Sequence, residues 1–347
     1  MSEPTFPGPL ETDHPHEVWI IQPPRRRLWI HVALLLATFI STMMVGSRIE
    51  FNFEHRQPAF WMSEDSPPLF ALSALTHPSE LLSGLPFSLT LMFILLAHEM
   101  GHYLYARHYR VYATLPYFVP FPSLIGTLGA FIRIKSPIPS RAALFDIGIA
   151  GPIAGFIPAC IALIAGLSLS RPIAASDPSS LQLGFPLAFH LAARILHIAT
   201  PLPTLSLHPV ATAAWVGMFA TALNLLPGGQ LDGGHIVFSI SPQIHRAVSF
   251  LTVLALIPLG RYFWTGWLVW SVLLAMTLRH PPVPREPSVS GRRRLVALFG
   301  ALMFILSFTP APFTHSSGRE VWPEIRDNSR DTIHSLRDTV RHWLHRK

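Results

Sequence analysis

The stretch LTLMFILLAHEMGH, residues 89–102, decides the fold of this chain. An apolar run ends in His98-Glu99-Met100-Gly101-His102, so ionisable side chains stand in a segment that otherwise suits lipid. Four helical residues turn through about 400°, which leaves the two histidines about 40° apart on one helix face. Two imidazoles placed in this way can share a metal ion, and the adjacent Glu99 can serve as a base. Because ionisable groups at membrane depth are costly and usually functional, the stretch predicts a metal site inside a membrane helix.

The composition indicates a membrane protein. The 347 residues are 50% hydrophobic and 13% charged, whereas soluble globular proteins carry about 25% charged residues. A single cysteine, Cys160, excludes an internal disulfide framework. The net charge of +7 arises from arginines beside apolar segments, which suits anionic lipid headgroups, so the lipid bilayer and not nucleic acid is the expected partner.

The apolar segments predict an α-helical polytopic membrane protein with about six to seven transmembrane helices. The predicted spans lie near 28–47, 85–106, 144–169, 208–226, 246–260, 263–279 and 294–310. The glycine-containing, β-prone run 125–135 predicts a strand or hairpin that dips into the membrane.

The chain divides into three predicted parts. Residues 1–27 are polar and proline-rich, which predicts a disordered cytoplasmic N-terminus without a cleavable signal peptide. Residues 28–310 form the membrane-embedded domain, with a core at 85–280. Residues 311–347 form an amphipathic C-terminal tail.

The segment 184–200 sets the topology. His190, Arg194 and His197 favour a helix lying at the interface over a membrane span. With that helix flat, most arginines and lysines of the loops fall on the side of the metal site, and this side is predicted to be cytoplasmic.

A catalytic zinc needs three protein ligands and an open position for water, so one ligand besides His98 and His102 must come from elsewhere. Asp232 is the candidate, since it follows Pro227-Gly228-Gly229 and precedes Gly233-Gly234, where glycines let the backbone turn towards a buried metal. His235 is the alternative ligand. Asn224 is expected two turns before Asp232 on the same helix face, where its amide could hold a polarised carbonyl or orient a substrate backbone. An interhelical hydrogen bond is the alternative.

Two features of the third predicted span have structural interpretations. The small residues from Gly148 to Gly155 let helices approach closely. Asp146 is predicted to cap the start of the helix.

These motifs resemble those of the site-2 protease family of intramembrane zinc metalloproteases. The chain carries its HExxH motif at His98–His102 and its Asn-x-x-Pro-x-x-x-x-Asp-Gly pattern from Asn224 to Gly233. The stretch from Gly126 to Gly155 is also similar, and the likeness covers about 85–280. It is greatest to the branch without a PDZ domain, which includes bacterial and chloroplast homologues.

The resemblance implies one Zn²⁺ per chain held by His98, His102 and Asp232, with Glu99 activating water. It implies cleavage within or near transmembrane segments of membrane-anchored regulators, such as anti-sigma factors. The expected location is a bacterial inner membrane, with the active site towards the cytoplasm. No oligomeric state is predicted.

A transmembrane substrate must unwind before it can be cut, and its freed backbone groups then need new partners in lipid. The β-prone run can offer a strand edge for this purpose, so Gly129, Ala130 and Phe131 are predicted to bind substrate together with Asn224. A purely structural hairpin is the alternative.

Other classes of protein fit the sequence less well. A Gly-x-Ser-Gly serine nucleophile is absent, and Asp232 lacks the Gly-x-Gly-Asp context of aspartyl intramembrane proteases. A zinc transporter would need ionisable residues along a path, and a catalytically inactive membrane chaperone would be expected to lack Glu99.

Overall fold

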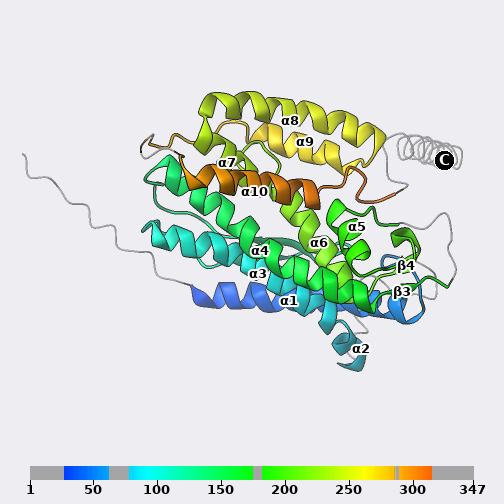
Figure 1. Cartoon of the computed structure of the whole chain (residues 1–347). Coiled ribbons are helices and arrows are strands. Elements are labelled where there is room, and N and C mark those ends of the chain that lie inside the picture. The colour runs from blue at the N-terminus through cyan, green and yellow to red at the C-terminus, as the bar shows by residue number, and fades with distance from the viewer. Residues whose placement is uncertain (1–26, 62–77, 175–181, 285, 287–288, 315–347) are drawn as a thin grey trace, which may run out of the picture.

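The structure is a computed structural model that describes residues 27–61, 78–174, 182–284, 286 and 289–314. The predicted disordered N-terminus lies outside the described residues except for Arg27, and so does nearly all of the predicted C-terminal tail. The described part is mostly helical, with long helices running side by side (Figure 1).

Four of the described helices are long and apolar enough to cross a membrane. They are α1 (Leu28–Glu54), α3 (Leu85–His108), α4 (Arg141–Leu169) and α8 (Pro242–Tyr262). The other predicted spans correspond to the shorter helices α6 (Pro209–Asn224), α9 (Gly266–Met276) and α10 (Arg292–Ser307). The larger count of six to seven spans therefore remains a prediction.

Short elements connect these helices. The helical ones are α2 (Pro78–Ser83), α5 (Leu187–Ile195), the 3-10 helix η2 (Leu202–Thr204) and α7 (Asp232–Ile240). Helix α5 lies within the segment 184–200 and has nine residues. At 1.5 Å per residue it extends about 14 Å, which is too short to cross a hydrocarbon core of about 30 Å.

Two small antiparallel sheets complete the described fold. Strand β1 (Tyr117–Pro120) pairs with β2 (Thr127–Phe131), with Phe118 opposite Ala130. The register shifts between Phe118 and Pro120. Strand β3 (Arg171–Pro172) pairs with β4 (Leu205–Ser206). Strand β2 falls within the run expected to be a strand, while its depth in a membrane remains a prediction.

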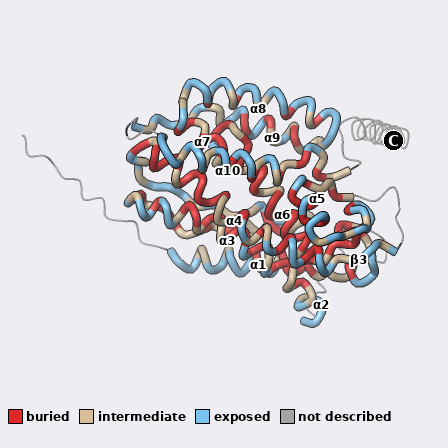
Figure 2. Tube along the Cα trace, in the orientation of Figure 1, coloured by how far each residue is buried: buried red, intermediate tan, exposed pale blue. Residues whose placement is uncertain are grey.

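Helix α4 forms the centre of the molecule. It packs against α3, α6 and α7, and the buried part of the chain is concentrated where these helices meet (Figure 2). Gly101 of α3 lies so close to the backbone oxygen of Ala150 that an added Cβ would collide with it. This close approach sets the His98–His102 segment directly against α4.

The start of α4 differs from the prediction. The side chain of Ser140 accepts a hydrogen bond from the backbone N–H of Ala143 at 3.1 Å and so caps the helix. Asp146 lies more than one turn further along and instead accepts two hydrogen bonds from Arg293 of α10, at 2.9 and 2.7 Å. It also accepts one from the Tyr109 hydroxyl. The cap prediction for Asp146 was wrong because the helix begins at Arg141, before the predicted span of 144–169, so Ser140 takes the cap position.

Candidate metal centre

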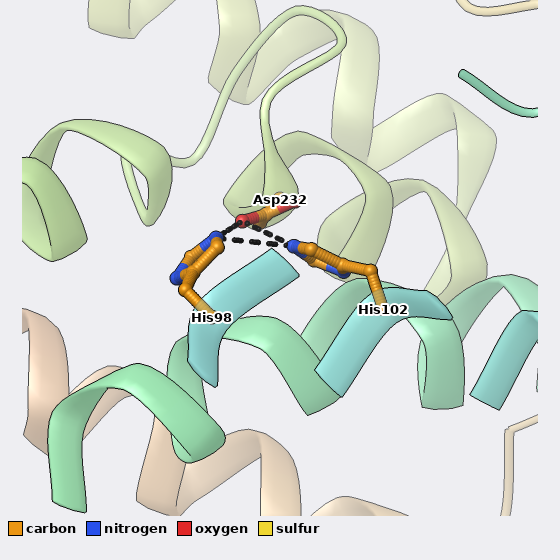
Figure 3. A group of neighbouring side chains, drawn as sticks. All are labelled: His98, His102 and Asp232. Atoms are coloured by element: carbon orange, nitrogen blue, oxygen red, sulfur yellow. Dashed lines mark hydrogen bonds and ion pairs between the residues drawn. The ribbon is translucent and has the colours of Figure 1, made fainter. Parts of the chain in front are cut away.

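Three side chains from two elements converge at one point. His98 and His102 project from the same face of α3 towards Asp232, the first residue of α7 (Figure 3). Oδ2 of Asp232 lies 3.2 Å from Nε2 of His98 and 3.3 Å from Nε2 of His102, and the two Nε2 atoms are 3.1 Å apart. Among the described residues, these three form a group whose ligand atoms could hold a metal ion.

The three separations match the shape of a zinc site. Ligand atoms about 2.0–2.1 Å from a tetrahedral zinc lie about 3.3 Å from one another. The triangle formed by the two Nε2 atoms and Oδ2 has nearly these edges. The donor set of two imidazoles and one carboxylate is also one that zinc accepts, with a fourth position left for water or substrate.

The orientation of His102 is fixed by the neighbouring helix. Nδ1 of His102 lies 2.8 Å from the backbone oxygen of Ile147, which can only accept a hydrogen bond. Nδ1 therefore carries the proton, and in the neutral ring Nε2 keeps a lone pair directed at the shared point. Metal-binding histidines generally make such a bond with their second nitrogen.

Two glycines of α4 make room for the imidazole rings. A Cβ at Gly151 would collide with the ring of His102, and one at Gly155 would lie 2.9 Å from Cβ of His98. The small residues of this span were expected to allow helix packing in general. Their particular role beside the two histidine rings depends on the register of α3 against α4, which the sequence does not specify.

A loop, and not a continuous helix, brings Asp232 to this point. Helix α6 ends at Asn224 and α7 begins at Asp232, so the expectation that both residues lie on one helix face was wrong. Pro227, Gly228 and Gly229 interrupt the helix, and Gly229 has a φ of +59° that favours glycine. Added Cβ atoms at Gly233 and Gly234 would collide with the backbone oxygens of residues 225–229, so these glycines permit the tight return of the loop.

Helix α8 holds this loop in place. The side chain of Ser249 accepts a hydrogen bond from the Gly229 N–H at 3.1 Å, and Nε2 of His245 lies 2.9 Å from the Gly229 carbonyl oxygen. Both side chains are buried. Neither His245 nor Ser249 was predicted from the sequence to support the site. Their only sequence signal is two polar side chains at i and i+4 at the start of an apolar helix.

The metal-ligand candidates open onto a cavity of about 250 Å³. Glu99, Asn224, Ala130 and Phe131 line it together with the three candidate ligands, whereas Gly129 is not among its lining residues. Nδ2 of Asn224 lies 3.3 Å from Nε2 of His98.

His235, the alternative ligand, also lines the cavity but is engaged elsewhere. Its Nδ1 lies 2.8 Å from Nε2 of His280. It does not belong to the group of His98, His102 and Asp232 whose ligand atoms lie within 4.8 Å of one another.

The structure combines a candidate metal centre of two histidines and one aspartate with helices long enough to cross a membrane. These two features define the class of membrane metalloproteins with an HExxH helix. Within this class the chain belongs to peptidase family M50, whose family model matches residues 86–259. This confirms the resemblance to site-2 proteases.

The chain is also similar to plant proteins. It is 30% identical over 330 residues to the protein named probable zinc metalloprotease EGY1, chloroplastic, of Arabidopsis thaliana, covering 89% of this chain and 56% of the relative. It is 34% identical over 241 residues to the rice (Oryza sativa subsp. japonica) protein of that name, covering 66% and 41%. The Arabidopsis protein named probable zinc metalloprotease EGY2, chloroplastic, is 33% identical over 251 residues, covering 70% and 44%. The chain thus spans about half the length of these relatives.

Proposed function

We propose that this protein is an intramembrane zinc metalloprotease that hydrolyses peptide bonds within or near transmembrane segments of membrane-anchored proteins. The main support is that Asp232 of α7 meets His98 and His102, which lie with Glu99 in a helix long enough to cross a membrane. Membership of peptidase family M50 and the zinc metalloprotease names of the relatives support it.

His98, His102 and Asp232 are proposed to hold one zinc ion per chain. When bound, zinc supplies a positive charge that acidifies water and polarises a substrate carbonyl. Glu99 lines the same cavity but is not one of the three candidate ligands. Its carboxylate can therefore accept a proton from the attacking water. Glu99 can then return this proton to the leaving amine.

Asn224, Gly129, Ala130 and Phe131 are proposed to bind substrate. Ala130 and Phe131 of β2 line the metal-site cavity, and β1 is the one described strand that pairs with β2. An unwound substrate can therefore add to the other edge of β2, where it meets new hydrogen-bond partners beside the metal. Gly129 would contribute through the backbone of β2, since its position is outside the cavity lining.

A proline variant tests this binding mode. Ala130→Pro removes one backbone donor of β2, whereas the matched Ala130→Gly variant keeps it. With zinc content and thermal stability verified in both, cleavage is expected to fall in the proline variant and to persist in the glycine variant. Normal cleavage by a folded, zinc-loaded Ala130→Pro variant would exclude strand addition at this position.

The protein is proposed to lie in a bacterial inner membrane, with its site towards the cytoplasm. Arginines flank the helix ends nearest the metal site, including Arg110, Arg141, Arg279 and Arg292, and this pattern is typical of cytoplasmic loops. In a Cys160→Ser background, a cysteine at Pro139 should react with a reagent confined to the cytoplasmic side. A cysteine at His55 should react from the opposite side, and the converse labelling would reverse the topology.

The proposed protease domain is 28–310, with its core at 85–280, flanked by the polar segments 1–27 and 311–347. An inactive membrane chaperone or a zinc transporter is not favoured, because Glu99 lines the metal-site cavity and the relatives are named as proteases. Proteomics of membrane fragments from cells carrying the wild type or Glu99→Gln would test the activity and identify substrates. Identical fragment patterns would argue against proteolysis.

A further inference from the structure

A second cavity lies beside α7, the helix that begins with Asp232. It has a volume of about 590 Å³ and lies between the first turns of α8, helix α7 and the segment that follows α9. The described residues that line it are Phe238, His245, Arg246, Phe250, Leu278, Arg279 and His280. We call it the basic cavity. Its volume lies within the range of about 300–1,000 Å³ that is usual for small-molecule sites.

The charge of the basic cavity is positive and unbalanced. Among the described residues, its lining has two arginines and no carboxylate. Neither Arg246 nor Arg279 takes part in an ion pair with any carboxylate of the described residues. A guanidinium group binds phosphate through two parallel, charge-assisted hydrogen bonds. Two arginines without an ion pair among the described residues, both lining one cavity, therefore favour a phosphate group as ligand.

His280, one of the two histidines in the lining of the basic cavity, is held by its neighbours. Nδ1 of His280 donates to the backbone oxygen of Pro281 at 2.7 Å, so in the neutral ring its Nε2 accepts from Nδ1 of His235 at 2.8 Å. The ring also stacks on Phe238, with centroids 3.9 Å apart. Burial lowers the pKa of His280, which disfavours a positive charge on this ring, whereas the two arginines of the lining are positively charged.

The surroundings of the cavity suit a lipid. Arg246 is in the second turn of α8, and Arg279 comes three residues after the end of α9, so both stand near the ends of apolar helices. Phe250 is 56% exposed, and the next side chains along α8, Leu251 and Leu254, are 61% and 45% exposed. An acyl chain can cover this apolar face while the headgroup meets the arginines.

We propose that the basic cavity binds the phosphate group of an anionic phospholipid through Arg246 and Arg279. Free phosphate in solution could bind to the same two arginines, and a titration with both ligands distinguishes it from the lipid headgroup. A ligand held there contacts His280, whose partner His235 lines the metal-site cavity. The two cavities are thus connected through one pair of hydrogen-bonded histidines.

The test is calorimetric titration of the purified full-length chain in a nonionic detergent. The probes are short-chain phosphatidylglycerol, short-chain phosphatidylcholine and inorganic phosphate. Saturable binding of phosphatidylglycerol, tighter than that of phosphatidylcholine, is expected. Arg246→Gln with Arg279→Gln should weaken it about 30-fold, since each basic residue contributes about 1 kcal/mol to such binding.

The matched control is Arg292→Gln with Arg294→Gln, which removes two exposed arginines of α10 that do not line the basic cavity. This pair should leave phosphatidylglycerol binding within about twofold of the wild type. Inorganic phosphate that binds as tightly as phosphatidylglycerol, with the same dependence on Arg246 and Arg279, would support the phosphate site and assign it to the free anion.

Wild-type phosphatidylglycerol binding by the Arg246/Arg279 double variant, or an equal loss in the control, would overturn the proposal. The single variants Arg246→Gln and Arg279→Gln keep the test available if the double variant is not monodisperse. Each should show an intermediate affinity.

Discussion

Helix α3 supplies His98 and His102 through the regular spacing of one helix, whereas Asp232 reaches the same point from an irregular loop between α6 and α7. The histidine pair needs only a continuous helix and room for its rings. The aspartate needs a loop whose tight path depends on Gly229, Gly233 and Gly234, and hydrogen bonds between this loop and α8. The relative position of the two histidines therefore follows from local sequence, whereas the position of the third candidate ligand depends on tertiary structure.

The largest effect is expected at Glu99, which helix α3 carries between the two histidines. Glu99→Gln keeps the shape of the side chain but cannot accept a proton from water, so cleavage should fall by about 10²–10⁴-fold. Zinc content and thermal stability should match the wild type, because Glu99 is outside the three-ligand group. Cleavage at the wild-type rate by this variant, with zinc verified, would remove Glu99 as the base.

Asn224 is the next most sensitive position. Its amide stands beside Nε2 of His98 in the metal-site cavity, where it can stabilise a polarised substrate carbonyl. Asn224→Ala should lower the cleavage rate by about 10²-fold, as for other groups of this kind, with zinc retained. Loss of zinc in parallel with activity would mean that Asn224 supports the ligands and does not contact substrate.

Gly151 of α4 tests the half of the site that helix α3 supplies. A Cβ at Gly151 collides with the ring of His102, so Gly151→Ala should lower zinc affinity by about 10- to 100-fold, as measured by competition with a chelator. Gly300→Ala is the matched control, since an added Cβ there meets only the flexible end of Ile149 at 2.8 Å. Equal zinc affinity in the two variants would contradict the close contact between Gly151 and the ring of His102.

Ser249 tests the half specified by tertiary structure. Ser249→Ala leaves the buried N–H of Gly229 without its acceptor, which costs about 1–3 kcal/mol of stability. Zinc affinity should fall about tenfold as the loop before Asp232 loosens. Ser271→Ala also removes a buried serine that contacts α8, through the Val253 carbonyl oxygen at 3.2 Å, and should leave zinc affinity unchanged. A similar loss in both variants would contradict a specific role for Ser249.

The same division explains what the sequence could predict. The HExxH pair and the long apolar helices follow from local spacing and hydropathy, and the predicted limits of α3 agree with the structure to within two residues at its C-terminus. Asp232 was also predicted as the third ligand, because its flanking glycines signal a turn, and it lies beside the two histidines in the structure. The placement of Asn224 on the same helix face failed, since Pro227 and the following glycines end that helix earlier.

Other features could not be predicted because they arise between elements far apart in the chain. Asp146 pairs with Arg293, which is 147 residues away, and His245 contacts Gly229 across the interface between α8 and the loop. Nothing in the local sequence distinguishes these polar residues from helix caps or interfacial side chains. The room left for His102 by Gly151 likewise depends on how α3 and α4 are aligned.

Zinc K-edge X-ray absorption on the purified chain tests the central claim most directly, because it counts the imidazoles bound to the metal. We expect one zinc per chain, bound by two imidazoles with oxygen as the remaining ligands, and a loss of most of the zinc in Asp232→Ala. Three imidazoles at the metal, with zinc retained in Asp232→Ala, would contradict it and assign the third ligand to His235.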